Sequence, residues 1–248
     1  MYLSKAAVAS KAALVFPELA PVEQSKPKAL TTAVREKFSV RDPQSLLEIR
    51  RGTPSASTLS FMNMHEYGDL LVNFMRARKR TFIEQLGWDL PQADGMEFDQ
   101  YDTPFCRWVV IHDYGEVLGG VRLTPSTAKC GMYSYMLRDA QSGLLEPIPR
   151  DVLFFRAPVD PQIWEASRLF IVREVPAPRR TSVQTLIMNR MTEAARELGG
   201  THVIGIVPAV WSRWLRRLDL DAIPVGPRFA IDGTISQAAL FKTSRYVN

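Results

Sequence analysis

Three charged side chains interrupt the most apolar segments of the sequence, and they limit how the chain can fold. Arg122 lies in the segment GGVRLT, and Glu165 and Arg168 lie in WEASRLFIV, two runs with the composition of buried β-strands. A charge inside such a strand costs free energy unless an opposite charge or hydrogen bonds compensate it. The fold must therefore bring other charged residues to these strands.

Candidate partners for these charges occur earlier in the sequence. Residues 65–86 carry apolar side chains at intervals of three and four, which predicts a helix, and Arg78 lies late in it. Asp99 and Asp102 lie in an acidic, turn-rich segment before the first predicted strand. These residues either form a structural ion-pair network that joins helix, loop and sheet, or they line a binding site. Spacing alone leaves both interpretations open.

Period-two alternation of side chains along a strand sets the directions expected around Glu165. Glu165 and Ser167 share one face, whereas Arg168 lies on the other face unless a bulge intervenes. On the preceding predicted strand, Gly119 and Gly120 indicate a bulge or a close approach of another backbone.

The remaining hydrophobic pattern predicts a mixed fold. Apolar strands at 105–112 and 117–124 enclose the turn DYGE and form a hairpin. A third strand at 164–172 precedes a long helix, which we expect to be capped by Thr181 or Ser182 and ended by a glycine pair. Later segments predict a strand at 202–207, a short helix at 209–218, an extended segment at 222–227 and a closing strand at 236–244. This order predicts an α+β or three-layer α/β architecture.

The first 55 residues differ in composition from the rest of the chain. They contain scattered prolines and hold 9 Lys/Arg and 5 Asp/Glu, whereas the remaining 193 residues hold 22 and 21. We expect residues 1–55 to form an N-terminal extension, either partly ordered or an accessory cap, and residues 56–248 to form the main domain. Because the basic excess lies in the extension rather than in the folded body, we expect no nucleic-acid binding.

Signals for export, membranes and metals are weak. No apolar run approaches the roughly 20 residues that span a bilayer, and no small-residue cleavage pattern follows the first apolar stretch. Cys106 and Cys130 are too few for a disulfide framework and fit a reducing compartment. The three histidines are scattered without ligand spacing. We therefore expect a cytoplasmic protein without a membrane span or a metal, and its oligomeric state stays unknown.

The charged residues combine with two aromatic ones in a specific order. The pattern runs from Arg78-x3-Phe82-x5-Trp88 through Asp99-x2-Asp102 and Arg122 in RLTP to Glu165-x-Ser167-Arg168 in WEASRLFIV. This combination resembles the acyl-homoserine lactone synthases, the LuxI-type autoinducer synthases. The resemblance covers roughly residues 60–245, so the first 55 residues lie outside it.

The resemblance implies both a fold and a reaction. The fold is that of the GNAT acyltransferases, a splayed, mostly antiparallel sheet flanked by helices. In the reaction, the amine of S-adenosylmethionine takes an acyl chain from a thioester of acyl carrier protein or of coenzyme A. The methionine part then closes to a lactone, and methylthioadenosine leaves. Both reactants are substrates, so no cofactor is expected. A GNAT-like N-acyltransferase that uses another amine without lactonisation is the alternative.

The resemblance also implies roles for individual residues. Glu165 is expected to act as general base, with Ser167 and Arg168 beside it as catalytic residues, although a buried glutamate is more often a salt-bridge partner. The residues expected to bind S-adenosylmethionine are Arg78, Phe82, Trp88, Asp99, Asp102 and Arg122. Carboxylates suit its cationic groups, guanidiniums suit its carboxylate, and aromatic faces suit its sulfonium. Plain core packing is the alternative for the two aromatic residues.

The acyl donor is expected at the start of the long helix. Arg179 and Arg180 precede the predicted helix cap and are candidates for the phosphate of phosphopantetheine, with a solvated basic turn as the alternative. Acyl carrier protein is acidic, so a basic surface would attract it. Candidates for that surface are Arg150, Arg156, Arg213, Arg216 and Arg217. Candidates for the acyl pocket are Phe154, Phe155, Met188, Val207 and Trp211.

Overall fold

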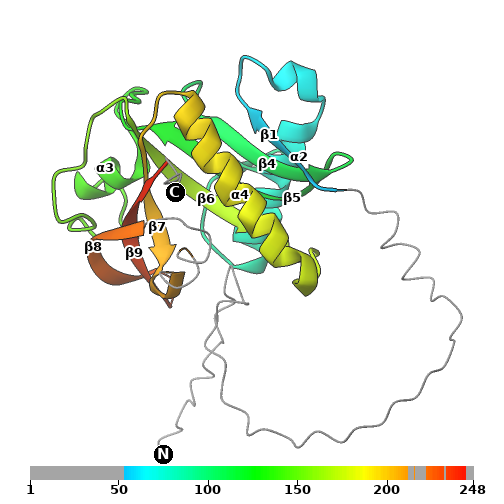
Figure 1. The fold of residues 1–248 in the computed structure, drawn as a ribbon. Helices are drawn as coiled ribbons and strands as arrows, with labels where there is room; N and C mark the ends of the chain where they lie inside the picture. The colour runs from blue at the N-terminus through cyan, green and yellow to red at the C-terminus, as the bar shows by residue number, and fades with distance from the viewer. Residues whose placement is uncertain (1–52, 212–214, 216–221, 232, 244–248) are drawn as a thin grey trace, which may run out of the picture.

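A computed structural model describes residues 53–211, 215, 222–231 and 233–243. In this part of the chain, seven strands form one sheet in the order β1-β4-β5-β6-β7-β9-β8 (Figure 1). The strands are β1 (Ser55–Leu59), β4 (Arg107–Asp113), β5 (Glu116–Pro125), β6 (Ile163–Ile171), β7 (His202–Pro208), β8 (Ala222–Ile231) and β9 (Thr234–Lys242). Neighbouring strands are antiparallel except β6 and β7, which are parallel.

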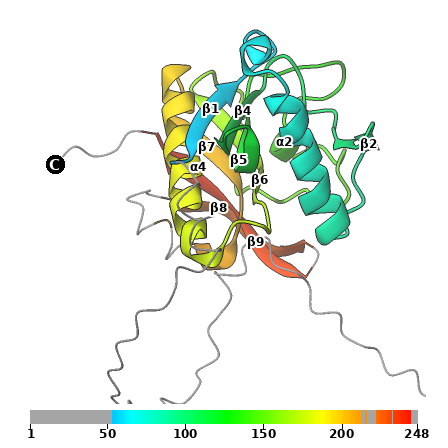
Figure 2. The same ribbon diagram turned by 90° about the vertical axis from the view of Figure 1, so that its right-hand side faces the viewer.

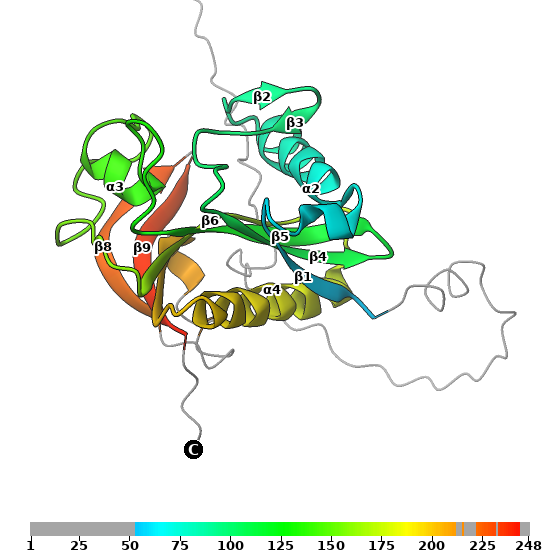
Figure 3. The same cartoon turned by 90° about the horizontal axis from the view of Figure 1, so that it is seen from above.

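Helices cover both faces of the sheet. The helical elements are η2 (Met64–Tyr67), α2 (Leu70–Arg78), the π-helix η3 (Lys79–Gln85), α3 (Met136–Gln141), α4 (Ala177–Glu197) and η4 (Ala209–Trp211). Figure 2 shows the sheet between α2 and α4, and Figure 3 shows the same three layers from above. The prediction of a three-layer, mostly antiparallel α/β/α fold is confirmed. None of the described helices is long and apolar enough to cross a membrane.

The predicted helix at 65–86 is present as three consecutive segments. A short 3-10 helix leads into α2, and the chain continues directly as the π-helix η3. The π-helix carries one extra residue per turn, which changes the direction of the side chains that follow Arg78. A two-stranded ribbon, β2 (Gln92–Ala93) and β3 (Met96–Glu97), follows and lies beside α2 in Figure 3.

Two glycines in β5 allow the sheet to pack closely. A Cβ atom on Gly120 would lie 2.2 Å from the carbonyl oxygen of Val109, and one on Gly119 would lie 2.5 Å from that of Phe170. Such distances exclude any side chain at both positions, so the predicted close backbone approach is confirmed. The pairing of β5 with β6 also shifts register between Gly120 and Arg122.

The parallel strands β6 and β7 pair only at their first residues. Cα partners run from Ile163 with His202 to Ala166 with Gly205, and the remainder of β6 pairs only with β5. The two strands therefore separate after Ala166, which is the splay that the resemblance implies. Glu165, near the end of the paired region, thus lies at the point where the sheet opens.

The long helix α4 begins earlier than the sequence predicts. Its first residue is Ala177 and its N-cap is Pro176, so the expected cap at Thr181 or Ser182 is wrong. Pro178 lies in the first turn, where the fixed φ of proline is already helical and its missing N–H costs nothing. The buried stripe of α4 packs against the sheet with Val183, Ile187, Met188, Met191, Ala194 and Ala195.

The predicted boundary after residue 55 falls within the first strand of the sheet. Ser55, which we assigned to the extension, already begins the edge strand β1. Residues 1–52 of the predicted extension lie outside the described residues, as do Arg213, Arg216 and Arg217 of the predicted basic surface. The predicted segment at 222–227 is the first half of the longer strand β8.

Candidate active site

Arg78 enters a buried ion-pair network from the C-terminal end of α2. Its guanidinium donates to both oxygens of Asp102, at 2.7 and 2.9 Å, and its Nε donates to Glu97. Arg78 and Glu97 are both fully buried. This two-pronged contact with a carboxylate is the geometry for which arginine is suited.

Arg122 joins the same network from β5. Its Nη1 contacts Asp99 and lies 3.1 Å from Asp102 Oδ2, and its Nε donates to Ser167 Oγ at 3.1 Å. The ring of Tyr101 lies 5.6 Å from the guanidinium carbon. The fully buried Arg122 is thus compensated by two carboxylates, as the composition of its strand requires.

Arg168 completes the network from β6. Its Nε lies 3.1 Å from Glu97 Oε1, and its Nη2 lies 2.9 Å from Asp99 Oδ2. Its backbone φ is +56°, a left-handed value that is costly for a residue with a side chain. This conformation falls where the pairing of β5 with β6 is irregular. A bulge therefore intervenes, so Arg168 contacts the network that Ser167 also reaches instead of lying on the opposite face.

Sequence analysis missed Glu97, which bridges Arg78 and Arg168. The reason is that residues 89–104 were interpreted as a turn-rich loop, whereas Glu97 ends strand β3. The signal was the spacing of Glu97 and Asp99, since residues two apart in an extended segment point the same way. Trp108 was also missed, and its Nε1 donates to Asp102 Oδ1 at 3.1 Å.

The network balances three carboxylates against three guanidiniums. Burial raises the pKa of the Asp102 carboxyl, but Arg122 and Arg78 outweigh burial and hold this pKa well below its ordinary value. Burial likewise opposes ionisation of Asp99, and Arg122 and Arg168 still lower its pKa. Asp99 and Asp102 are therefore charged at neutral pH, and their contacts join three arginines from three separate elements.

Two stacked aromatic rings adjoin the network at Arg168. Phe82 and Trp88 stack with ring centroids 5.0 Å apart and planes inclined by 21°, and the guanidinium carbon of Arg168 lies 5.7 Å from the Phe82 ring. Phe82 is buried, whereas Trp88 is only half-buried. Trp88 is therefore the more accessible ring of the stacked pair, and Phe82 is the ring that contacts Arg168.

Glu165 lies beside the network rather than inside it. Its oxygens accept backbone N–H bonds from Met136 at 2.9 Å and Leu137 at 2.7 Å, in the first turn of α3. Within the described residues it forms no ion pair, so the salt-bridge interpretation does not apply to the contacts seen. The side chain is fully buried. It shares its face of β6 with Ser167, which confirms the expected alternation.

The surroundings of Glu165 raise its pKa to about 7. Burial is the largest cause, because it disfavours the carboxylate. The N–H groups of Leu137 and Met136 and the charge of Arg122 oppose it, and Asp139 adds a smaller rise. A carboxyl with such a pKa both accepts and releases a proton near neutral pH, which is the property that a general base needs.

The predicted acyl pocket is not assembled from the expected residues. Phe154 and Phe155 are 70% and 43% exposed, so their assignment to a buried pocket is wrong in this structure. The N–H of Phe154 donates to Val225 on β8, and this contact turns the preceding Val152 and Leu153 inward instead. Met188, a residue of α4, is buried in the main core, and the half-buried Val207 packs against that core. The side chain of Trp211 lies outside the described residues.

A second hydrophobic cluster lies on the side of the sheet where Glu165 meets α3. Its buried members are Tyr135, Leu137, Ala140, Val152, Leu153, Ala157, Ile204, Val225 and Ala238. Ile204 pairs with Glu165 across the parallel strands, and Leu137 donates its N–H to the Glu165 carboxylate. This cluster is therefore the apolar surface that adjoins the candidate base.

The two arginines predicted to bind phosphate differ in exposure. Arg180 is buried and donates to the carbonyl oxygen of Val172 at 3.1 Å. Arg179 is half-buried, and its Nη2 lies 3.5 Å from Asp113 Oδ2. Only Arg179 is thus placed on the surface, at the first turn of α4.

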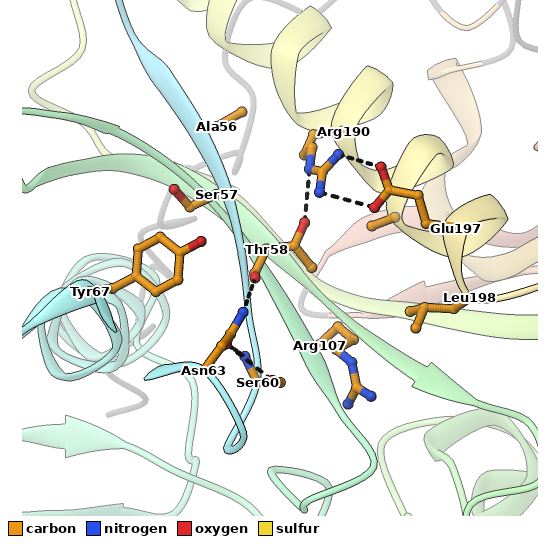
Figure 4. A pocket seen from close by; sticks show the side chains of 11 residues that line it. Ala56, Ser57, Thr58, Ser60, Asn63, Tyr67, Arg107, Arg190, Glu197 and Leu198 are labelled. Atoms are coloured by element: carbon orange, nitrogen blue, oxygen red, sulfur yellow. Dashed lines mark hydrogen bonds and ion pairs between the residues drawn. The ribbon is translucent and has the colours of Figure 1, made fainter. Parts of the chain in front are cut away.

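A cavity of about 340 Å³ lies away from the network, between β1 and α4. Figure 4 shows Arg190 and Glu197 on one side of β1 and Tyr67 on the other. Arg190 is already bonded to Thr58 Oγ1 at 2.9 Å and to Glu197 at 2.9 and 3.1 Å. We favour the network over this cavity as the reaction site, because Glu165, whose pKa is raised to about 7, lies beside the network and not among the residues that line the cavity.

Comparison with known proteins identifies the family. Residues 62–246 match the sequence model of the autoinducer synthases. The chain belongs to this family. Over 161 residues, this autoinducer synthase is 32% identical to an acyl-homoserine-lactone synthase of Aeromonas hydrophila, covering 63% of the chain and 72% of that protein. It is 30% identical over 183 residues to the isovaleryl-homoserine lactone synthase of Bradyrhizobium diazoefficiens, covering 73% and 76%.

The fold of this autoinducer synthase also matches solved structures. BjaI, a coenzyme A-dependent acyl-homoserine lactone synthase solved with S-adenosylmethionine and isopentyl-CoA, superimposes with a TM-score of 0.64 at 26% identity. The match covers 78% of this chain and 85% of that one. The resemblance drawn from the spaced charges is therefore confirmed, and the protein is an acyltransferase of the acyl-homoserine-lactone synthase class.

Proposed function

We propose that Glu165 is the general base with which this synthase acylates the amine of S-adenosylmethionine. The observation that carries the proposal is a fully buried carboxylate with a pKa raised to about 7, placed at the splay of β6 and β7 beside the ion-pair network. Each of its oxygens accepts one backbone N–H and keeps a second lone pair. That lone pair is available for the ammonium of the substrate or for one intervening water.

The reaction then follows from these positions. Glu165 takes a proton from the ammonium, and the free amine attacks the thioester carbonyl, from which the thiolate leaves. The nitrogen releases a second proton as the amide forms, and this proton neutralises the departing thiolate. The substrate carboxylate next attacks the carbon that carries the sulfonium, the C–S bond breaks, and methylthioadenosine departs with both bonding electrons. The second step has no acid or base requirement, so it depends on holding the carboxylate in line behind the reacting carbon.

The network supplies the groups that hold S-adenosylmethionine. Nη2 of Arg122 is buried and has no partner among the described residues, so it is the remaining donor for the substrate carboxylate. Arg168 is the most exposed guanidinium of the three, with 11% of its side chain exposed. The substrate therefore enters past Arg168, and its sulfonium rests against the stacked rings of Phe82 and Trp88.

The acyl thioester fits the opening between β6 and β7. Beyond Ala166 and Gly205 the facing backbone groups of the two strands make no ladder bonds to each other. These groups can hydrogen-bond an extended pantetheine arm, whose amides resemble a peptide. The acyl chain then passes over Ile204 and Leu137 into the second hydrophobic cluster. Arg179, at the surface of the first turn of α4, is the candidate residue for binding the phosphate of phosphopantetheine.

Both acyl carriers remain candidates for the donor. BjaI was solved with isopentyl-CoA, which supports coenzyme A. The experiment is to incubate the purified protein with S-adenosylmethionine and a panel of acyl thioesters on both carriers, and to identify products by mass spectrometry. An acyl-homoserine lactone formed together with methylthioadenosine supports the proposal. An acylated amine without methylthioadenosine would indicate the N-acyltransferase instead.

A further inference from the structure

The turn before α3 is held by a carboxylate that the mechanism does not use. Asp139 is buried, and its two oxygens accept the backbone N–H of Ser134 at 3.2 and 3.0 Å. Ser134 Oγ donates to the carbonyl oxygen of Ala128 at 3.0 Å, and the Tyr135 hydroxyl donates to that of Pro158 at 2.6 Å. The turn is thus tied down at three separate points.

This turn presents the N–H groups that hold Glu165. Tyr135 is extended, with φ −126° and ψ 160°, and the helix starts immediately after it. The N–H groups of Met136 and Leu137 therefore have no partner within the helix and point out of its first turn toward the carboxylate of Glu165. Any movement of the turn would move Glu165 or break these bonds.

We propose that Asp139 is a positioning residue that fixes the turn holding Glu165 and, through its negative charge, favours proton uptake by Glu165. The inference rests on the proposed role of Glu165 as general base. It assigns Asp139 two separable effects, one through the hydrogen bonds to Ser134 and one through its charge.

The groups around Glu165 come from three elements. Arg122 on β5 lowers the pKa of Glu165, and Asp139 on α3 raises it. Burial raises the pKa of Tyr101, before the hairpin, and of Tyr135, so both hydroxyls stay protonated and neutral at physiological pH. Arg138, also on α3, partly offsets the effect of burial on the pKa of Asp139. Among these groups, Asp139 supplies the negative charge that faces Glu165.

The test separates charge from hydrogen bonding. Asp139→Asn keeps an oxygen that accepts from Ser134 and removes the charge, so the acid limb of the kcat/KM pH profile should move to lower pH by roughly 0.5 unit. Asp139→Ala removes both effects and should also lower kcat, while KM for S-adenosylmethionine changes little. Asp160→Asn is the matched control, because Asp160 also accepts a turn N–H, from Gln162, and should leave the profile unmoved.

The outcomes distinguish this inference from the function on which it rests. Near-normal turnover by Glu165→Gln would show that Glu165 is not the general base, and it would overturn the inference as well. An inactive Glu165→Gln together with an unmoved profile for Asp139→Asn would overturn the role of Asp139 alone. Should Asp139→Asn not fold, Asp139→Ser takes its place as a neutral acceptor. Failure of both to fold would reduce Asp139 to a structural residue and also overturn the inference.

Discussion

Arg168 Nε lies 3.1 Å from Glu97 Oε1, although 71 residues separate them in the chain. The same carboxylate contacts Arg78 at the end of α2. One buried side chain therefore joins the helix that precedes the sheet to the bulged central strand. Since Arg168 is held in a left-handed conformation, the energy of these contacts also maintains the irregular backbone at the site.

Replacing Glu97 with glutamine should destabilise the fold and slow the reaction. The substitution keeps the shape but leaves Arg168 with one carboxylate instead of two, so we expect a loss of about 3 kcal/mol in the free energy of unfolding. The displaced guanidinium should lower kcat/KM about 100-fold. Urea unfolding and release of methylthioadenosine measure the two effects. Glu116→Gln, at an exposed position of β5, is the control and should change neither.

Replacing Arg168 with lysine should weaken substrate binding more than folding. Lysine tolerates the left-handed backbone no better and no worse than arginine, so the backbone strain is matched. Its single ammonium cannot contact both Glu97 and Asp99 in the present geometry. We expect the Kd for S-adenosylmethionine to rise roughly 10-fold by calorimetry. Arg190→Lys, on the face of α4 that lines the cavity beside β1, serves as control, and an equal effect there would argue against a specific role for Arg168.

The need for partners of the charges inside the strands could be predicted, because the free energy of burying a charge depends on the apolar residues next to it in the sequence. Arg122 and Arg168 stand in apolar segments, so the need for partners is visible without a structure. Glu97 was not predictable in this way, since a two-residue strand has too little hydrophobic pattern to be recognised. The position of Glu97 depends on tertiary contact with α2, which overrides the local signal of a turn-rich loop.

The prediction that Phe154 and Phe155 are buried was wrong for a related reason. Phe154 and Phe155 are large and apolar, and burial is the usual expectation for such residues. Their direction is set instead by the contact of the loop with Val225 on β8, a strand more than sixty residues later. The prediction of the N-cap of α4 was wrong for a different reason. Thr181 satisfies the residue preference at an N-cap, but the proline near the start of α4 allows the helix to begin earlier.

The raised pKa of the Glu165 carboxyl should make the free energy of unfolding fall as pH rises. Its pKa is about 7 in the folded protein against an ordinary value of 4.5, so the folded state binds more protons between these values. Its contribution to stability is therefore lost as pH rises from about 4.5 through 7. Glu165→Gln should be more stable than wild type at pH 8 by on the order of 1 to 3 kcal/mol, and not at pH 4.

Urea unfolding at the two pH values measures this difference. Glu146→Gln, an exposed substitution in the loop that follows α3, is the control and should show no dependence of its effect on pH. A Glu165→Gln variant that is less stable than wild type at pH 8 would show that the carboxylate is better compensated than its burial indicates.

The stacked rings should contribute to binding of S-adenosylmethionine. Trp88→Leu removes the half-buried aromatic face and should raise the Kd roughly 5-fold, since such a stack contributes about 1 kcal/mol. Trp88→Phe keeps an aromatic face over Phe82 and should retain most of the affinity. Calorimetric titration with S-adenosylmethionine compares the two variants, and equal affinities for them would assign Trp88 to core packing.

The most direct test is a crystal structure of the wild-type protein with S-adenosylmethionine. We expect its amine nitrogen within about 3.2 Å of the Glu165 carboxylate, or joined to it by one water, and its sulfonium against Phe82 and Trp88. Binding in the 340 Å³ cavity between β1 and α4 instead, with Glu165 bonded only to Met136 and Leu137, would contradict the account.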